Sequence, residues 1–208
     1  MENKKTEVKS QKAAENAAKK MAKKAAAKRE ISVNIEIPAG VDVKRTNNDV
    51  VVSGSGKSLS KSFAHPRIKV DVVEKEGRAV VINTKSTRKK ERAVVGTWSA
   101  HIRNMITGVT RGFAYKLKII YTHFPINVKV VGTEIQVSNF LGERGYRGAP
   151  IIGDTKVTVE KEIITVRGAN IENVGGTCSN LEQACALRRV DRRKFPDGIY
   201  LFEKGFEK

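Results

Sequence analysis

The stretch VDVKRTNNDVVVS, residues 41–53, occurs a second time as INVKVVGTEIQVS, residues 126–138. The offset between the two copies is 85 residues throughout, so Lys129 corresponds to Lys44 and Ser138 to Ser53. Alternating apolar and polar residues around a turn signal are typical of a β-hairpin. A hairpin that recurs in this way indicates a duplicated structural unit.

The similarity continues beyond this hairpin. RIKVDVVEKEGRAVVINT (67–84) resembles TKVTVEKEIITVRG (155–168), and both predict a further pair of strands. VGTWSAHIRNMI (95–106) resembles GGTCSNLEQACAL (175–187), now at an offset of 80. Loop insertions and deletions explain this drift in the offset. Each copy therefore contains one predicted helix after its strand pairs.

The apolar spacing in the first of these segments is helical. Trp98, Ile102, Met105, Ile106 and Val109 fall on one helical face. We expect Thr97 to cap the start of the first helix. We expect Thr177 at the equivalent place in the second helix, where Ser179 and Glu182 form a possible capping box. FAYKLKIIYTHFP (113–125) is predicted to be a strand that Pro125 ends.

The predicted fold class is α+β, with two tandem copies of a small antiparallel sheet and one packed helix each. A run of strands with one helix argues against a parallel, doubly wound sheet. The expected domains are a basic Ala/Lys-rich arm over residues 1–30, a first repeat over 31–122 and a second over 123–208. The arm shows no apolar stripe that could dock on a core.

The charge of the chain points to a polyanionic partner. Its 208 residues include 40 Lys and Arg against 22 Asp and Glu, a net charge of +18. Basic side chains displace counterions from phosphates, which makes nucleic acid the expected partner. A membrane partner is not expected, since no run approaches the roughly 18 apolar residues of a membrane span. We find no secretory leader either, and we expect a cytoplasmic protein.

The string GSGKS, residues 54–58, raises the question of an NTPase. The P-loop pattern requires a glycine five positions before Gly56, where this chain has Val51. A P-loop also leads into a helix, whereas LSKSFAHPRIKV follows here. We therefore interpret these residues as a hairpin connection, in which Lys57 and Lys61 are candidate contacts to the RNA backbone.

The matching loop of the second copy is SNFLGERGYRGAPIIG, residues 138–153. Residues 142–145 fit the GXXG of a KH domain, but that motif joins two helices and this one follows a strand. Glycine lets the backbone approach a ligand, arginine binds phosphate and aromatic rings stack on bases. The candidate RNA-binding residues are Phe140, Gly142, Arg144, Tyr146 and Arg147.

The densest basic segment is LRRVDRRKFPDGIYLFEK, residues 187–204. Residues 125–208 carry 13 basic and 11 acidic residues, so a local excess of cations defines a face. A solvated helix end is the alternative. The turn residues are Pro196, Asp197 and Gly198, where Asp197 either caps the turn or holds an arginine. The candidate RNA-binding cations are Arg188, Arg189, Arg192, Arg193 and Lys194.

No catalytic or metal-binding set emerges from the sequence. Cys178 and Cys185 lie seven residues apart, which suits one helical face better than a CxxC pair, and we expect buried thiols. The three histidines are scattered. We expect no enzyme activity, no metal and no cofactor.

VSNFLGER (137–144) and RKFPDGIYLFEKG (193–205), within a duplicated α+β unit, resemble the sixth protein of the large ribosomal subunit in its archaeal and eukaryotic form. The resemblance covers about residues 31–206. It implies two domains on large-subunit ribosomal RNA, the second near the sarcin–ricin loop and the site where translation factors dock. It also implies that residues 139–148 and 188–198 face RNA. The arm is a departure from this family.

The expected partners are therefore large-subunit ribosomal RNA, neighbouring proteins at the stalk base and translation factors nearby, without homo-oligomers. The alternative is a free-standing KH-like or other RNA-binding regulator. A regulator that reads single strands needs a cluster of exposed aromatic residues or a helix-flanked GXXG. The sequence predicts neither.

Overall fold

The computed structural model describes residues 31–73, 78–84, 88–187, 191 and 193–207. The predicted arm over residues 1–30 lies outside the described residues, as do Arg188, Arg189 and Arg192. By contacts, the chain divides into two compact units. The first contains Lys44–Val50 and Lys61–Ile102 with the chain up to Pro38. The second contains Ala39–Val43, Val51–Ser60 and Arg103–Lys208.

The first half of the chain is built from strands followed by one long helix. In chain order its elements are β1 (Ile31–Glu36), β2 (Val41–Thr46), β3 (Asp49–Gly54), β4 (Lys57–Ser62), β5 (Ile68–Val73), β6 (Ala79–Thr84) and α2 (Lys89–Thr110). The strands form two antiparallel sheets in the orders β2-β3-β4 and β1-β6-β5. The apolar face of α2 is buried, and the ring of Trp98 meets Phe63 edge-on at 5.3 Å between centroids.

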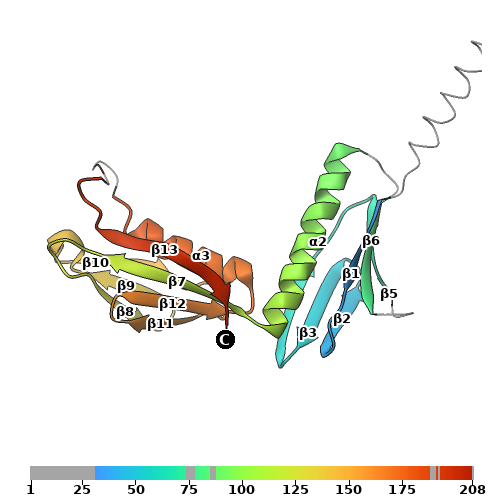
Figure 1. Cartoon of the computed structure of the whole chain (residues 1–208), viewed down its shortest axis with the longest axis horizontal. Coiled ribbons are helices and arrows are strands. Elements are labelled where there is room, and N and C mark those ends of the chain that lie inside the picture. Colours follow the sequence, from blue (N-terminus) through green and yellow to red (C-terminus); the bar gives the residue numbers. More distant parts are fainter. Residues whose placement is uncertain (1–30, 74–77, 85–87, 188–190, 192, 208) are drawn as a thin grey trace, which may run out of the picture. The chain divides into compact units, whose positions relative to one another are not determined.

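The second half repeats this order. Its elements are β7 (Phe113–Ile120), β8 (Asn127–Val131), β9 (Glu134–Ser138), η1 (Phe140–Gly142), β10 (Tyr146–Pro150), β11 (Lys156–Glu160), β12 (Ile163–Gly168), α3 (Ile171–Ala184) and β13 (Gly198–Phe206). The sheets are β10-β9-β8 and β11-β12-β7-β13. Figure 1 shows α3 along the sheet that contains β7, β12 and β13. Leu117, Ile135, Ile164 and Leu181 are fully buried between these elements. The predicted α+β fold with two similar halves is confirmed.

Strand β7 belongs to the second half. It pairs antiparallel with β12 (Val166 opposite Tyr115) and with β13 (Ile199 opposite Ile119). In the first half, β1 pairs with β6 in the same way, so β7 takes the place of β1. Residues 113–120, which we expected in the first repeat, pair with strands of the second half, because an alternating strand pattern does not show which sheet will accept the strand. The domain bounds 31–122 and 123–208 stay a prediction, and this pairing favours a division before Phe113.

Both helices begin earlier than their predicted caps. Thr97 lies inside α2, where its hydroxyl donates to the carbonyl of Ala93 at 3.0 Å. In α3 the cap is Asn170, whose side chain accepts from the amide of Glu172 at 2.9 Å. Thr177 is fully buried inside the helix. The hydroxyls of both threonines donate to the backbone carbonyl four residues earlier in the helix. A threonine can cap a helix or make this bond inside one, and the sequence alone does not distinguish the two.

The predicted capping box is also absent from its expected place. Glu182 accepts a hydrogen bond from the amide of Leu201 at 2.8 Å, and Ser179 accepts one from Gln183 at 3.1 Å. Glu182 therefore joins α3 to β13, a contact between residues far apart in sequence that local spacing does not reveal.

Candidate nucleic-acid interface

Three loops meet at one end of the second unit, where β7 ends and β13 begins (Figure 1). The amide of Thr122 donates to the carboxylate of Asp197. The side chain of Asn139 donates to the carbonyl of Pro125 at 3.0 Å. A Cβ on Gly142 would lie 3.4 Å from the ring of Phe124. We call residues 120–126, 139–146 and 193–197 the loop end.

The 139–146 loop has an unusual backbone. Asn139, Leu141 and Gly142 have φ values of 58°, 53° and 78°, all in the left-handed region. Asparagine and glycine tolerate this region, but a leucine there costs about 1–2 kcal/mol. The side chain of Leu141 is also exposed. Strained, exposed backbone of this kind is found preferentially at functional sites.

Phe140 does not serve the role that the sequence suggests. Its side chain is 1% exposed and lies in the core with Ile135 and Leu181. A ring so deeply buried is inaccessible to a base, so the expectation that Phe140 stacks on RNA was wrong. Aromatic residues in glycine-rich loops attract that interpretation, but here the ring anchors the loop to the core.

Arg147 fixes the same loop. Its guanidinium lies 4.4 Å above the centroid of the Phe140 ring and donates to both carboxylate oxygens of Glu143, at 2.9 and 2.6 Å. It also donates to the carbonyl of Ala184 at the end of α3, at 3.0 Å. The hydrogen bonds from Arg147 lower the pKa of Glu143, and those to Glu143 raise the pKa of Arg147. These contacts give Arg147 a structural role, and its contact to RNA phosphate stays a prediction.

Several exposed side chains of the loop end are aromatic or basic. Tyr146 is 61% exposed, and Arg144 is exposed beside it. Sequence reasoning missed three further exposed rings, Tyr121, Phe124 and Phe195. The signal for two of them was the stretch YTHF (121–124), with two aromatic residues in a turn before a proline. Flat rings beside cations can stack on bases and neutralise phosphates.

Two of the five candidate cations in the basic segment are described by the structure, and both belong to the loop end. Arg193 and Lys194 are exposed. Their amides donate to Asp191, Arg193 to the carboxylate and Lys194 to the carbonyl, each at 3.0 Å. Asp191 therefore shapes a turn that holds these two cations at the surface.

Asp197 makes a contact that neither of its two expected roles included. It is buried, and among the described residues it accepts from the amide of Thr122. Gly198 was expected to allow a positive φ, but it is a strand residue. A Cβ there would lie 3.0 Å from the ring of Tyr200, so close packing explains this glycine. Pro196 is exposed directly before this buried pair.

Lys57 and Lys61 contact residues that do not belong to the loop end. Ser55 and Gly56 form a two-residue turn between β3 and β4, with φ values of 48° and 74°. Positive φ at both turn residues suits a β-hairpin, which confirms that GSGKS is not a P-loop. Lys57 approaches Glu207, at the far end of β13, at 3.5 Å. Lys61 contacts His101 at 3.3 Å.

Comparison with known proteins identifies the family. The family model described as ribosomal protein L6 matches residues 37–112 and 124–198, which is most of the chain and covers both halves. The chain belongs to the ribosomal protein L6 family. Members are structural ribosomal proteins and not enzymes, so the expectation of no enzymatic activity is confirmed.

Several curated proteins are similar to this L6 family member along nearly their whole length. Large ribosomal subunit protein uL6 of Methanobrevibacter smithii is 48% identical over 174 residues, covering 84% of this chain and 96% of that protein. The uL6 protein of Methanosarcina mazei is 43% identical, with 85% and 98% covered. That of Ignicoccus hospitalis is 41% identical, with 82% and 92% covered. The resemblance seen in the two sequence motifs is thereby confirmed.

Three further features concern the buried thiols, metal-ligating side chains and the helices of this L6 family member. Cys178 and Cys185 are buried, as expected, and burial raises their pKa values to about 12 and about 11. Within the described residues, His, Cys, Asp and Glu side chains form no group of three or more that could hold a metal ion. In the same part of the chain, no helix is long and apolar enough to cross a membrane.

Proposed function

We propose that this chain is a structural constituent of the large ribosomal subunit, in which the loop end binds ribosomal RNA. The observation that carries this proposal is the gathering of exposed rings and cations on one end of the second unit. Tyr146, Phe124 and Phe195 supply aromatic surface there, next to Arg144 and Arg193. The names of the relatives support the subunit.

The charge pattern of the loop end supports an anionic partner. Glu143 is paired with Arg147, and Asp197 is buried against the amide of Thr122. The charge of Glu143 is thus paired and the carboxylate of Asp197 is buried and hydrogen-bonded, whereas Arg144, Arg193 and Lys194 face solvent. Exposed cations beside rings suit the loops and bulges of folded RNA, where phosphates and unstacked bases occur together.

The proposal includes the place on the large subunit where the second half binds. By its resemblance to the family, the second half binds near the sarcin–ricin loop and the site of translation factors, with proteins of the stalk base as neighbours. The two segments implied by that resemblance, 139–148 and 188–198, correspond to two of the three loops that form the loop end. A role as a free-standing KH-like regulator is disfavoured, because η1 and β10 flank the GXXG residues where a KH domain has two helices.

Sucrose-gradient fractionation of cells that express the tagged chain tests the subunit. We expect the chain in the large-subunit peak, and its absence there would contradict the proposal. A photo-crosslinking amino acid in place of Tyr146 tests the location, with Val131 as the matched control because it is similarly exposed. Position 146 should crosslink to large-subunit RNA near the sarcin–ricin loop. Crosslinks elsewhere would contradict the finer proposal alone.

A further inference from the structure

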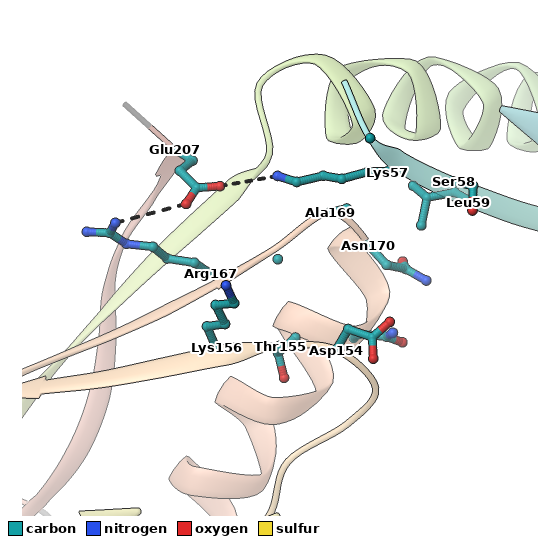
Figure 2. Close-up of a pocket in the computed structure, with 13 residues that line it drawn as sticks. Lys57, Ser58, Leu59, Asp154, Thr155, Lys156, Arg167, Ala169, Asn170 and Glu207 are labelled. Carbon is teal, nitrogen blue, oxygen red and sulfur yellow. Dashed lines mark hydrogen bonds and ion pairs between the residues drawn. The ribbon is translucent and has the colours of Figure 1, made fainter. Parts of the chain in front are cut away.

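A polar cavity of about 380 Å³ lies within the second unit, at the end of the sheet opposite the loop end (Figure 2). The beginning of β4, the strands β11 and β12 and the start of α3 line it. The charged and polar side chains that matter here are Lys57, Asp154, Lys156, Arg167, Asn170 and Glu207.

The cations of this cavity face one another. Lys156 and Arg167 are direct partners across the antiparallel pair β11–β12, so their side chains stand on the same face of the sheet. Like charges directly opposite each other destabilise a sheet unless an anion compensates them. Lys57 approaches from the β3–β4 hairpin (Figure 2). The geometry therefore favours an anion among these three side chains.

In the free protein, Glu207 supplies that anion. Its carboxylate lies 3.5 Å from the Lys57 ammonium and 4.0 Å from the Arg167 guanidinium, as the dashed lines in Figure 2 show. Close charge-assisted hydrogen bonds are about 2.7–2.9 Å long, so both contacts are loose. Asp154 also lines the cavity, but among the described residues only Glu207 forms ion pairs with these cations. Glu207 at these distances leaves the three cations incompletely neutralised.

The backbone holds Glu207 at this position. Its amide donates to the carbonyl of Gly112 at 3.2 Å. Gly112 has a φ of 70°, and a Cβ on it would lie 2.7 Å from a carboxylate oxygen of Glu207. The glycine therefore leaves room for the carboxylate. Only the side chain must turn away to admit another anion.

The start of α3 adds to the positive potential of the cavity. Ala169 and Asn170 line it directly before the helix. Amide groups at a helix N-terminus carry partial positive charge and favour phosphate. The helix end strengthens a site that the three cations define.

We propose that this cavity binds a phosphate of the RNA backbone through Lys57, Lys156 and Arg167, and that Glu207 occupies the place of that phosphate until RNA displaces it. This inference rests on the proposed RNA-binding function and deepens it by naming a second contact site. A phosphate carries more charge and more acceptor oxygens than a carboxylate, so it can satisfy three cations at once.

Glu207→Gln in the full chain tests the displacement. Removing the competing charge should raise the affinity for large-subunit RNA by about two- to fivefold, because the exposed ion pairs of Glu207 contribute a stabilisation of that size. Glu203→Gln is the matched control, because Glu203 lies in the same C-terminal segment, pairs with Lys116 at 2.8 Å and is absent from the cavity lining. An equal rise in both variants would reflect net charge alone and would overturn the proposal.

The cations are tested through the salt dependence of binding. Lys57→Ala and Arg167→Ala should each lower the salt slope by about one, while Lys116→Ala leaves it unchanged. Unchanged slopes in folded Lys57 and Arg167 variants, with RNA still bound, would overturn this inference and leave the proposed function standing. Loss of RNA binding by the unmodified chain itself would instead overturn the proposed function.

Inorganic phosphate distinguishes the source of the anion. We expect millimolar phosphate, compared with chloride at equal ionic strength, to leave the amide signals of Gly112 and Arg167 unshifted, since a single free phosphate lacks the neighbouring RNA contacts. Two results together would show a site for free phosphate and contradict the proposal: amide signals that shift saturably with phosphate, and a salt slope of RNA binding that Lys57→Ala leaves unchanged.

Discussion

The hairpin β3–β4 and its counterpart β9–β10 begin alike and end differently. Both follow the repeated stretch, in which Ser53 corresponds to Ser138. After Ser53 the chain turns within two residues, Ser55 and Gly56. After Ser138 it passes through η1 and a loop before β10 starts at Tyr146.

This difference shows how a duplicated fold acquires a new surface. The short turn needs only left-handed φ values at two residues, one of which is a glycine. The longer loop needs side chains to hold it, and Phe140, Arg147 and Asp197 provide contacts to the core or to neighbouring loops. With the loop held by these residues, Tyr146 and Arg144 remain free to face solvent.

Phe140→Ala should produce the largest effect. Removing a fully buried ring leaves a cavity and costs about 3–5 kcal/mol of unfolding free energy. Ser55, the residue at the same offset in the short turn, should tolerate Ser55→Gly with almost no change, because glycine favours its φ of 48°. Tyr146→Ala should also leave stability nearly unchanged. Denaturant unfolding measures all three, and equal effects at positions 55 and 140 would break the comparison between the hairpins.

Asp197→Ala should have an intermediate effect. The substitution removes the acceptor for the amide of Thr122 and should cost about 1–3 kcal/mol. Asp197→Asn keeps an oxygen at that place and should cost less. Thermal unfolding and hydrogen exchange of the Thr122 amide report on both variants. If alanine and asparagine behave alike, the tie between the loops contributes nothing to stability.

Alkaline pH should destabilise the second half more than the first. Both cysteines lie in the second half, and desolvation by burial raises their pKa values from 9.0 to about 12 and about 11. A raised folded-state pKa gives stability that is complete below the unfolded pKa and lost as pH rises through the folded pKa. The free energy of unfolding should therefore fall between about pH 9 and 12.

Two probes separate the halves in this experiment. Alkylation of the thiols reports opening of the second half, and fluorescence of Trp98, the single tryptophan, reports the first. Cys185→Ala should weaken the pH dependence seen by alkylation of Cys178. An identical pH dependence in wild type and variant would show that other groups cause the loss of stability.

Much of the fold could be predicted from the sequence, because alternation and repetition are local. The repeated hairpin, the strand pairs and the apolar face around Trp98 needed only the order of residues. The pairing of β7 and the bond between Asp197 and Thr122 could not be predicted. Both join residues whose partners lie far along the chain, and only the folded sheet brings them together.

The candidate site divides in the same way. Residue type singled out Tyr146 and Arg144, which are exposed, and also Phe140, which is buried in the core. Exposure depends on which side of the loop faces the core, and a single ring in a glycine-rich loop carries no periodicity to reveal it. Phe195 was overlooked because the basic residues around it dominated the interpretation.

The salt dependence of RNA binding tests the central claim most directly. The claim is that the loop end of the second half binds ribosomal RNA. The variant with Arg144→Ala and Arg193→Ala is compared with one carrying Lys69→Ala and Lys129→Ala, exposed cations of strands β5 and β8. For the loop-end variant we predict a salt slope lower by about two for large-subunit RNA, with little change in the control. A folded loop-end variant with the wild-type slope, or equal losses in both variants, would contradict the account.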